Sequence, residues 1–377
     1  MNLERVSLTM LEKLNVKGFR KYNDFTVFDL ANVNIVLGDN NVGKTSFLEA
    51  VYVWCCGCNA GSFVNIPLSR GRYGFIQQPF WVMEELLSAV NDAQNVPMKM
   101  SFEGQFDGEQ VCFEHAIWPS DLLGVYNSSY QYNNQNSLLS SELTVNSNQM
   151  NSNQTKLIAK WQITQGEQSV ITDITIPANL IASKFYRPVK FIDLWSHTII
   201  LDNQQIYSAL KREQKLQKFT DELKKVFPDI LGFDMIPYPD GSTAPVSVIM
   251  SGDKVLPLYA CGDGVQRWFY ILGIMILYKN SIICIDEIDT GLHYKAQAEF
   301  SVNLVDYALK NGVQLFVTTH NIEFVDAFLD TVNDKRNDKM DKIRIITLKD
   351  TVDGITSRTM NAREAVEVRG NYNLELR

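Results

Sequence analysis

The stretch that most constrains the fold of this chain runs from Gly38 to Thr45 and has the spacing G-x-x-x-x-G-K-[ST] of a phosphate-binding loop. An apolar, strand-like run, residues 33–37, precedes it, and a helix-like segment, residues 46–51, follows it. Glycines let the backbone curl so that successive N–H groups converge on an anion, and the positive end of the helix dipole points at the same place. The residues expected to hold phosphate are Gly38, Asp39, Asn40, Asn41, Val42, Gly43, Lys44, Thr45 and Ser46.

Two side chains of this loop have expected roles of their own. Lys44 should reach the β- and γ-phosphates of a nucleotide, and the hydroxyl of Thr45 should lie on Mg²⁺. The alternative is chance, because the bare pattern occurs in on the order of one per cent of chains of this length. Chance does not account for the strand before the loop and the helix after it, so we interpret the loop as real.

Composition limits the possible classes of protein. With 377 residues, 45% of them hydrophobic, the chain can form one large core or two domains. The formal net charge of -8 argues against attraction of the whole surface to nucleic acid or anionic lipid, and leaves room for a local basic patch. The longest apolar run, residues 268–278, is too short to span a bilayer. Six cysteines without a disulfide framework, and a start without a secretion signal, suit a reducing cytoplasm.

A second apolar run, residues 281–285, ends in Asp286 and Glu287. A buried parallel strand reads as a continuous apolar run, and ligands gather at the carboxyl ends of such strands. Asp286 can therefore hold Mg²⁺ beside Thr45, and Glu287 can act as general base toward the attacking water. The alternative is a strand that ends in two solvated acids, which is a weaker interpretation in a chain that also has a phosphate loop.

Two further features complete the predicted site. The run 314–318 leads through Thr319 to His320, which we interpret as a sensor of the γ-phosphate, although a lone histidine is more often structural. The turn Gly262-Asp263-Gly264 heads the apolar helix expected over 268–278, and the N-terminus of a helix is a natural anion site. The turn could also be no more than a helix cap.

The remaining chain predicts an antiparallel insertion inside a larger α/β fold. An Asp107-Gly108 turn indicates a hairpin, and residues 126–155 are so rich in Asn, Ser and Gln that we expect a long loop there. Strands are expected over 11–16, 25–30, 98–106, 110–118 and 156–176, strand-like pieces over 235–258 around a turn at 239–241, and helices over 81–90 and 203–225.

Three close thiols, Cys55, Cys56 and Cys58, leave two interpretations open. A structural zinc ion needs four ligands, and no fourth lies nearby in the sequence. Buried or surface thiols without metal are the preferred interpretation.

Taken in this order, the motifs resemble those of ABC-type ATPases that include SMC and RecF proteins, and more closely the ATPase module of the OLD (overcoming lysogenization defect) family. The similarity covers nearly the whole chain. It comprises residues 18–22, the Walker A loop, the signature 262–267, the Walker B strand ending at 286–287, the D-loop 289–293, the switch 318–320 and the ending 374–377. Because residues 374–377 are similar to the usual ending of the family, the chain is expected to be complete.

The resemblance implies an α/β P-loop NTPase fold, an ABC-type ATPase head with a mostly parallel core sheet, an antiparallel lid sheet and an inserted helical and antiparallel region. It implies a single domain over 1–377, with an antiparallel insertion at 59–202 and a helical subdomain at 203–257. ATP and Mg²⁺ are the expected ligands. The lid strand is expected to bring Arg20 or Tyr22 near the nucleotide base.

Two departures from the family pattern matter. Gly262 stands where the wider ABC pattern has a serine, so backbone N–H groups would have to hold the γ-phosphate. The Q-loop glutamine cannot be placed, with Gln77 and Gln78 as candidates. The resemblance also implies head-to-tail pairing into a homodimer or larger homo-oligomer, in which the signature of one subunit closes on the nucleotide of the other.

The preferred function is an ATPase that senses or holds a partner and controls a separate effector, a nuclease or toxin, in bacterial anti-phage defence. Residues 321–377 are too short for the Toprim nuclease domain that OLD-like ATPases often carry. The alternative is a RecF- or SMC-like clamp in DNA repair or chromosome maintenance, which would bind nucleic acid. A transporter subunit and a scaffold with negligible turnover fit less well, and no membrane partner is expected.

Overall fold

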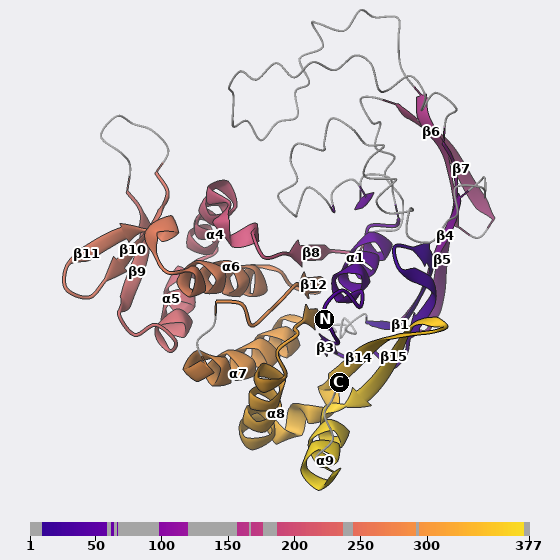
Figure 1. Ribbon diagram of the computed structural model, residues 1–377. Coiled ribbons are helices and arrows are strands. Elements are labelled where there is room, and N and C mark those ends of the chain that lie inside the picture. The colour runs from indigo at the N-terminus through magenta and orange to yellow at the C-terminus, as the bar shows by residue number, and fades with distance from the viewer. Residues whose placement is uncertain are drawn as a thin grey trace, which may run out of the picture.

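A six-stranded sheet in the order β15-β14-β3-β13-β12-β8 forms the centre of the fold (Figure 1). The computed structural model describes residues 10–58, 62–63, 66, 98–119, 157–165, 167–175, 187–236, 244–291 and 294–372. The five strands from β14 to β8 run parallel, and β15 is an antiparallel edge. The strands are β3 (Val33–Leu37), β8 (Val189–Ile192), β12 (Ile282–Ile285), β13 (Gln314–Thr318), β14 (Ile343–Thr351) and β15 (Gly354–Asn361). The predicted, mostly parallel core sheet is confirmed.

Continuous apolar runs form the middle strands because both faces of this sheet are covered. Every residue of β3, β12 and β13 is buried. Along β12, Ile283 and Ile285 pack in one core, and Ile282 and Cys284 pack in the other. Helices α6 (Asp263–Leu277), α7 (Tyr294–Asn311) and α8 (Ile322–Arg336) contribute to the first core, and α1 (Lys44–Cys55) contributes to the second. Helix α9 (Ala362–Tyr372) packs beside α8.

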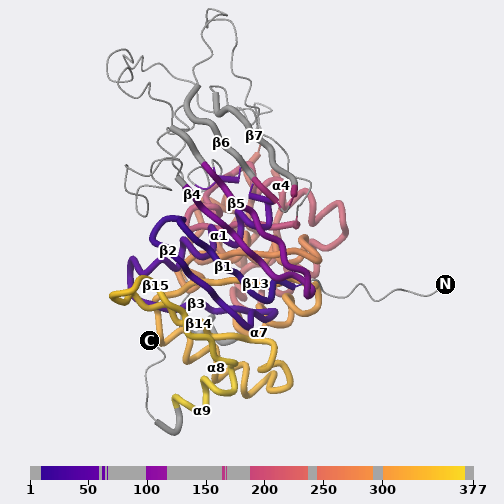
Figure 2. Tube along the Cα trace, turned by 90° about the vertical axis from the view of Figure 1, so that its right-hand side faces the viewer, coloured from indigo at the N-terminus to yellow at the C-terminus, as the bar shows by residue number. Residues whose placement is uncertain are grey.

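The second sheet is antiparallel and covers α1 on the side away from the core sheet (Figure 2). Its strands follow the order β2-β1-β4-β5-β6-β7, so the N-terminal hairpin and the later strands form one layer. The strands are β1 (Leu11–Phe19), β2 (Tyr22–Val27), β4 (Met98–Phe106), β5 (Glu109–Pro119), β6 (Leu157–Gln165) and β7 (Gln168–Thr175). The predicted antiparallel lid sheet is confirmed, and the turn of the β4–β5 hairpin has positive φ at Asp107 and Gly108.

Two expected elements have different bounds in the structure. The single strand expected over 156–176 is a hairpin, β6–β7. The helix expected over 203–225 is two helices, α4 (Ile200–Arg212) and α5 (Leu216–Lys224), with Gln214 at φ 57 between them. One turn beyond the buried Leu210, the next core-facing positions are Glu213 and Gln214, so a continuous helix would direct polar side chains at the core.

A small sheet, β11-β10-β9, lies beyond these helices. It comprises β9 (Ile230–Met235), β10 (Val246–Met250) and β11 (Lys254–Pro257). The strand-like pieces expected over 235–258 are β10 and β11, and β9 precedes them within the expected helical subdomain 203–257. Strand β8, inside the expected insertion 59–202, belongs to the core sheet. The domain division itself stays a proposal. The elements expected at 81–90, 126–155, 239–241 and 374–377, and both candidate glutamines, lie outside the described residues.

The chain leaves the core at the end of α1 and returns to nearly the same place. Cys58 is bonded through its backbone N–H to the carbonyl of Val53, and the backbone N–H of Arg187 donates to the carbonyl of Cys55 at 2.8 Å. Arg187 leads directly into β8. The two ends of the intervening segment are therefore joined by a backbone hydrogen bond.

None of the helices in the described part of the chain is both long and apolar enough to cross a membrane.

Buried His115 of β5 makes stability depend on pH. Its ring packs edge-on against Phe63 and Phe102, and burial lowers its pKa to about 3. The pKa of histidine in an unfolded chain is about 6.5, so below that pH the unfolded state binds a proton at His115 that the folded state does not bind. The free energy of unfolding is therefore not reduced by this histidine above pH 6.5. It decreases as the pH falls toward 3, by about 2 kcal/mol at pH 5. His115→Phe removes this titration, so between pH 7 and 5 its free energy of unfolding in urea should decrease by about 2 kcal/mol less than that of the unchanged protein. Equal decreases in the two proteins would contradict the assignment.

Candidate active site

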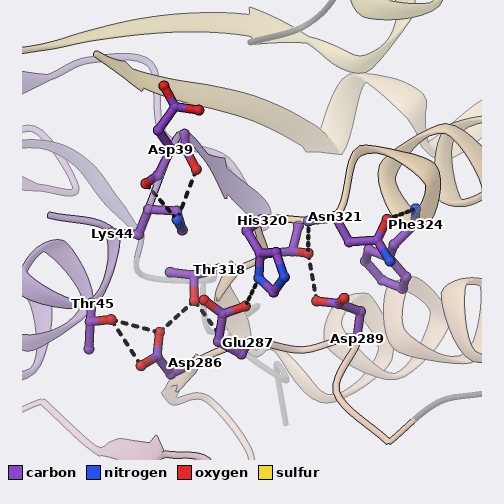
Figure 3. Close-up of polar contacts among 12 residues, drawn as sticks. Asp39, Lys44, Thr45, Asp286, Glu287, Asp289, Thr318, His320, Asn321 and Phe324 are labelled. Carbon is purple, nitrogen blue, oxygen red and sulfur yellow. Dashed lines mark hydrogen bonds and ion pairs between the residues drawn. The ribbon is translucent and has the colours of Figure 1, made fainter. Parts of the chain in front are cut away.

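The phosphate loop (residues 38–45) connects the end of β3 to the start of α1, as the sequence predicts. Gly38 and Gly43 have φ of 146° and 102°, conformations that favour glycine, and a Cβ on Gly38 would lie 2.7 Å from the carbonyl oxygen of Leu348. The Nζ of Lys44 donates to the carbonyls of Gly38 and Asp39 at 2.8 and 3.0 Å (Figure 3). This buried ammonium is thus held within the curl of the loop.

The carboxylate of Asp286 joins the phosphate loop to the end of β12. It accepts from the Thr45 hydroxyl at 3.1 and 3.0 Å and from the Thr318 hydroxyl, at the end of β13, at 2.6 Å. Figure 3 shows the three side chains converging from α1, β12 and β13. A carboxylate beside a hydroxyl is the oxygen donor set that Mg²⁺ prefers, so these residues fit the expected metal.

Glu287 and His320 form a pair at the same edge of the sheet. The Nδ1 of His320 lies 2.6 Å from a carboxylate oxygen of Glu287, and the backbone N–H of Glu287 donates to the Thr318 hydroxyl at 2.9 Å. Glu287 has φ 49, a left-handed conformation that costs free energy in a residue with a side chain. The strained backbone aims the carboxylate at His320 rather than along the strand. The structure thus brings Thr45, Asp286, Glu287 and His320 together.

The next residues fix the switch strand to the D-loop. Thr319 donates its hydroxyl to Asp289 at 2.6 Å and accepts from the backbone N–H of Asn321. The Asn321 side chain then caps α8 by accepting from the backbone N–H of Phe324. His320 therefore sits on a short, fully bonded connection (Figure 3).

Arg267 is a residue that sequence reasoning missed as part of the site. Only 1% of its surface is exposed, and one guanidinium nitrogen donates to the carbonyls of Asp286 and Glu287 at 2.7 and 2.8 Å. Burial lowers the pKa of this guanidinium, against the effect of Asp263 and Asp286. The sequence does contain a signal for this residue, because Arg267 places a charge at a core-facing position of an apolar helix, one turn before Tyr270. Arg267 connects α6 to the backbone of the acidic pair.

Removing this guanidinium should disturb both stability and turnover. Arg267→Met leaves two buried carbonyls without their charged donor, and we expect the free energy of unfolding to fall by about 3 kcal/mol. ATP hydrolysis should fall as well, because the backbone at Glu287 is no longer held. The control is Arg336→Met, which breaks a half-exposed pair with Asp306 and should cost about 1 kcal/mol or less. Equal stability of the two variants in urea would contradict the role of Arg267.

The signature turn (residues 262–264) begins α6, as predicted. Gly262 is the N-cap, and a Cβ built on it would meet nothing within 4 Å. Gly264 instead packs on the D-loop, because a Cβ there would lie 2.4 Å from the carbonyl oxygen of Gly291. The carboxylate of Asp263 accepts a hydrogen bond from the Nε2 of the buried His197 ring at 2.7 Å. One side of the turn is thus held inside the subunit, while the space beside Gly262 is open.

The β1–β2 turn contacts α1 and the phosphate loop through three consecutive side chains. Arg20 pairs with the fully buried Glu49 of α1 at 2.6 Å, and Lys21 donates to the carbonyl of Asn41 at 2.8 Å. The hydroxyl of Tyr22 donates to the carbonyl of Gly43 at 2.7 Å. Arg20 and Tyr22 thus bind the helix and the loop, and their expected contact with the nucleotide base stays a prediction.

The cysteine cluster is buried. Burial raises the pKa of Cys55 and Cys58 well above the usual thiol value and that of Cys56 to about 11. Such thiols are poorly ionised and poor nucleophiles. Within the described ranges, no group of three or more His, Cys, Asp or Glu side chains could hold a metal ion, so the zinc interpretation gains no support.

Comparisons with known proteins agree with this fold and with an ATPase. Residues 165–326 match a family described as "AAA domain, putative AbiEii toxin, Type IV TA system", and residues 10–55 match one described as "AAA ATPase domain". An "ATP/GTP phosphatase" of Helicobacter pylori is 23% identical over 354 residues, which cover 86% of this chain and 89% of the relative. The RecF protein of Ligilactobacillus salivarius is 49% identical over 43 residues, 11% of each chain.

Two solved SMC heads share the fold at low identity. One, bound to the C-winged helix domain of ScpA, is 11% identical with a TM-score of 0.55, covering 94% of this chain and 99% of that one. The other, bound to a C-terminal domain of ScpA derived from Pyrococcus furiosus, is 9% identical with a TM-score of 0.54, covering 97% and 100%.

Fold and site together define an ATPase of the AAA/ABC type. The chain has the α/β P-loop fold of an SMC head and is related to RecF over a short stretch of 43 residues.

Proposed function

We propose that the chain hydrolyses ATP at the edge of its core sheet, and that ATP-dependent pairing of two heads controls a separate effector protein. The observation that carries the proposal is the continuous network from Thr45 through Asp286 and Thr318 to Glu287 and His320. It supplies, side by side, ligands for a divalent cation, a general base and an imidazole. Those are the parts that phosphoryl transfer to water requires.

In the proposed reaction, a water oxygen attacks the γ-phosphorus while the bond to the β-phosphate oxygen breaks, giving ADP and phosphate. Glu287 takes the proton of that water. Lys44 and the backbone N–H groups of the phosphate loop stabilise the charge on the phosphate oxygens. Thr45 and Asp286 would hold Mg²⁺, which would supply positive charge to neutralise the charge that develops on the phosphate oxygens. His320 holds the Glu287 carboxylate in place through its Nδ1 and can sense the γ-phosphate.

Pairing would be head-to-tail, with the signature turn of one subunit on the nucleotide of the other. The turn is suited to an anion because Gly262 begins a helix of 15 residues and has open space beside it. With glycine at this position, backbone N–H groups of α6 would hold the γ-phosphate. The homodimer is then an ATP-dependent assembly that hydrolysis releases.

The pairing can be measured by light scattering on purified protein. Glu287→Gln should bind ATP without releasing the assembly, so its mass should double when ATP and Mg²⁺ are added. The double variant Lys44→Ala, Glu287→Gln should stay at the mass of the nucleotide-free protein, because binding requires the loop lysine. A mass that does not respond to ATP in either variant would argue against ATP-dependent pairing.

The effector is proposed to be a nuclease or toxin in anti-phage defence. Support comes from the resemblance to OLD-like ATPases and from the family description at residues 165–326, which includes a putative toxin of a toxin–antitoxin system. The test is protection of the native host against phage by this gene with its neighbours, and loss of protection with Lys44→Ala. Protection that survives Lys44→Ala would contradict a role for the ATPase.

The second candidate is a clamp on DNA in repair or chromosome maintenance. The similarity of short stretches, 43 and 67 residues long, to RecF proteins favours it. It predicts that double-stranded DNA increases ATP turnover and that salt weakens the effect, because phosphate contacts release counterions. The net charge of -8 argues for the effector proposal instead.

A further inference from the structure

A groove between α4 and α6 lies outside the ATPase site. It has a volume of about 850 Å³ and lies beside α4, the C-terminal half of α6 and the start of β8 (Figure 1). The helices are in close contact at Gly273, because a Cβ there would lie 2.5 Å from Ile206, and Tyr270, Ile274 and Leu277 of α6 line the groove. From Leu201 to Glu213 the lining follows α4 for about 18 Å.

The groove has a mixed lining, with apolar side chains beside polar and charged ones, and its rim is open. Ile206, Tyr270 and Ile274 are nearly fully buried beneath it. At the rim, Leu201 and Tyr278 keep 42% and 36% of their surface exposed. Sites for small molecules bury most of the ligand, whereas an open, elongated groove with apolar anchors suits a polypeptide segment.

Charge is distributed unevenly along the groove. Three cations, Lys190, Arg212 and Lys279, line it with two acids. Asp202 accepts from the Tyr270 hydroxyl at 3.0 Å and lies 3.9 Å from Lys190. Glu213 pairs with Lys215 and also lies in the field of Arg212 and Lys279, so its pKa is lowered. Both acids are thus engaged, and the groove is locally positive in a chain of net charge -8.

We propose that this groove binds an acidic amphipathic helix of a partner protein, with apolar side chains on the floor and carboxylates toward Arg212 and Lys279. The identity of the partner as the effector rests on the proposed function. The length of the groove matches about three turns of helix. Carboxylates are complementary to its surplus cations, and the open rim leaves the outer face of the bound helix in solvent.

The position of the groove links it to the ATPase. Helix α6 begins at the signature turn and ends at Leu277, which lines the groove. A partner helix would therefore contact the far end of the same rigid element that Arg267 ties to Asp286 and Glu287. Binding at one end can bias the other, and the coupling would act in both directions.

The experiment uses two fluorescein-labelled peptides of about three to four helical turns. Both carry leucine on one face; one carries glutamate on the other face and the second carries lysine. In fluorescence anisotropy with the full chain, the glutamate peptide should bind about tenfold more tightly than the lysine peptide. Arg212→Glu with Lys279→Glu should reverse that preference. Ser208→Trp, which fills the middle of the groove without changing charge, should weaken both peptides.

The matched control is Lys254→Glu with Lys349→Glu, which changes the net charge equally on exposed residues of β11 and β14. It should leave the preference unchanged. The proposal would be overturned if both double variants changed the peptide preference, because the preference would then follow net charge alone. It would also be overturned if the glutamate peptide did not bind, or if the groove variants did not affect its binding. A groove that pairs two copies instead would appear as a change in mass with Ser208→Trp and no peptide binding. Because these measurements need no ATP, their failure leaves the ATP-dependent pairing to its own test.

Discussion

Replacing Glu287 with glutamine should lower the rate of ATP hydrolysis by a factor of about 10²–10⁴, the usual contribution of a positioned general base. The amide keeps the size of the side chain and can still bond to His320, so nucleotide affinity should change little. Turnover is measured as phosphate release at saturating ATP, and affinity with a fluorescent nucleotide. The two readings separate chemistry from binding.

A matched acid nearby provides the control for this variant. Asp289→Asn removes a carboxylate that bonds to Thr319, two residues from Glu287, without touching the proposed base. Its turnover should fall less than that of Glu287→Gln. Unchanged phosphate release by Glu287→Gln, or an equal loss in both variants, would remove Glu287 from the role of base.

Replacing Lys44 with alanine should weaken ATP binding by about 10²–10⁴-fold. Hydrogen bonds to charged groups contribute about 1.5–3 kcal/mol each, and the ammonium is expected to reach two phosphates. The carbonyls of Gly38, which is buried, and Asp39, which is exposed, lose their charged donor, so the free energy of unfolding should fall by about 1–3 kcal/mol. Isothermal titration with ATP measures the affinity.

Lys21→Ala is the comparison for this second variant. Its ammonium also bonds to the phosphate loop, at Asn41, but it is exposed and should contribute about 1 kcal/mol or less. Retained affinity in Lys44→Ala, or a similar loss in Lys21→Ala, would contradict the assignment of the loop lysine. A loss confined to Lys44→Ala is the expected result.

The strands of the site could be predicted because their signal is local. β3, β12 and β13 are buried, mostly apolar runs, each followed by polar residues, and parallel strands bring such ends to one edge. The phosphate loop has a fixed spacing with two glycines, which a sequence shows directly. Asp286 and Glu287 at the end of one such run were therefore predictable as neighbours of Thr45.

The supporting contacts could not be predicted because they join distant segments. Arg267 meets the carbonyls of Asp286 and Glu287 only after α6 has packed on the core sheet, and no local pattern reveals the acceptor. Tyr22 reaches Gly43 because the antiparallel sheet covers α1. The break at Gln214 is a third case, since helical periodicity continues on both sides and only the polar residues at core positions indicate an end.

The hydrogen bond between Arg187 and Cys55 has a consequence for how such a chain can change over evolutionary time. Since the excursion begins and finishes at one point on the core, residues can be gained or lost outside its core strands β4 and β5 while the catalytic edge keeps its geometry. The entropic penalty of a longer excursion rises only with the logarithm of its length. Diversity among relatives, and room for engineered cargo, should therefore concentrate between these two anchor points.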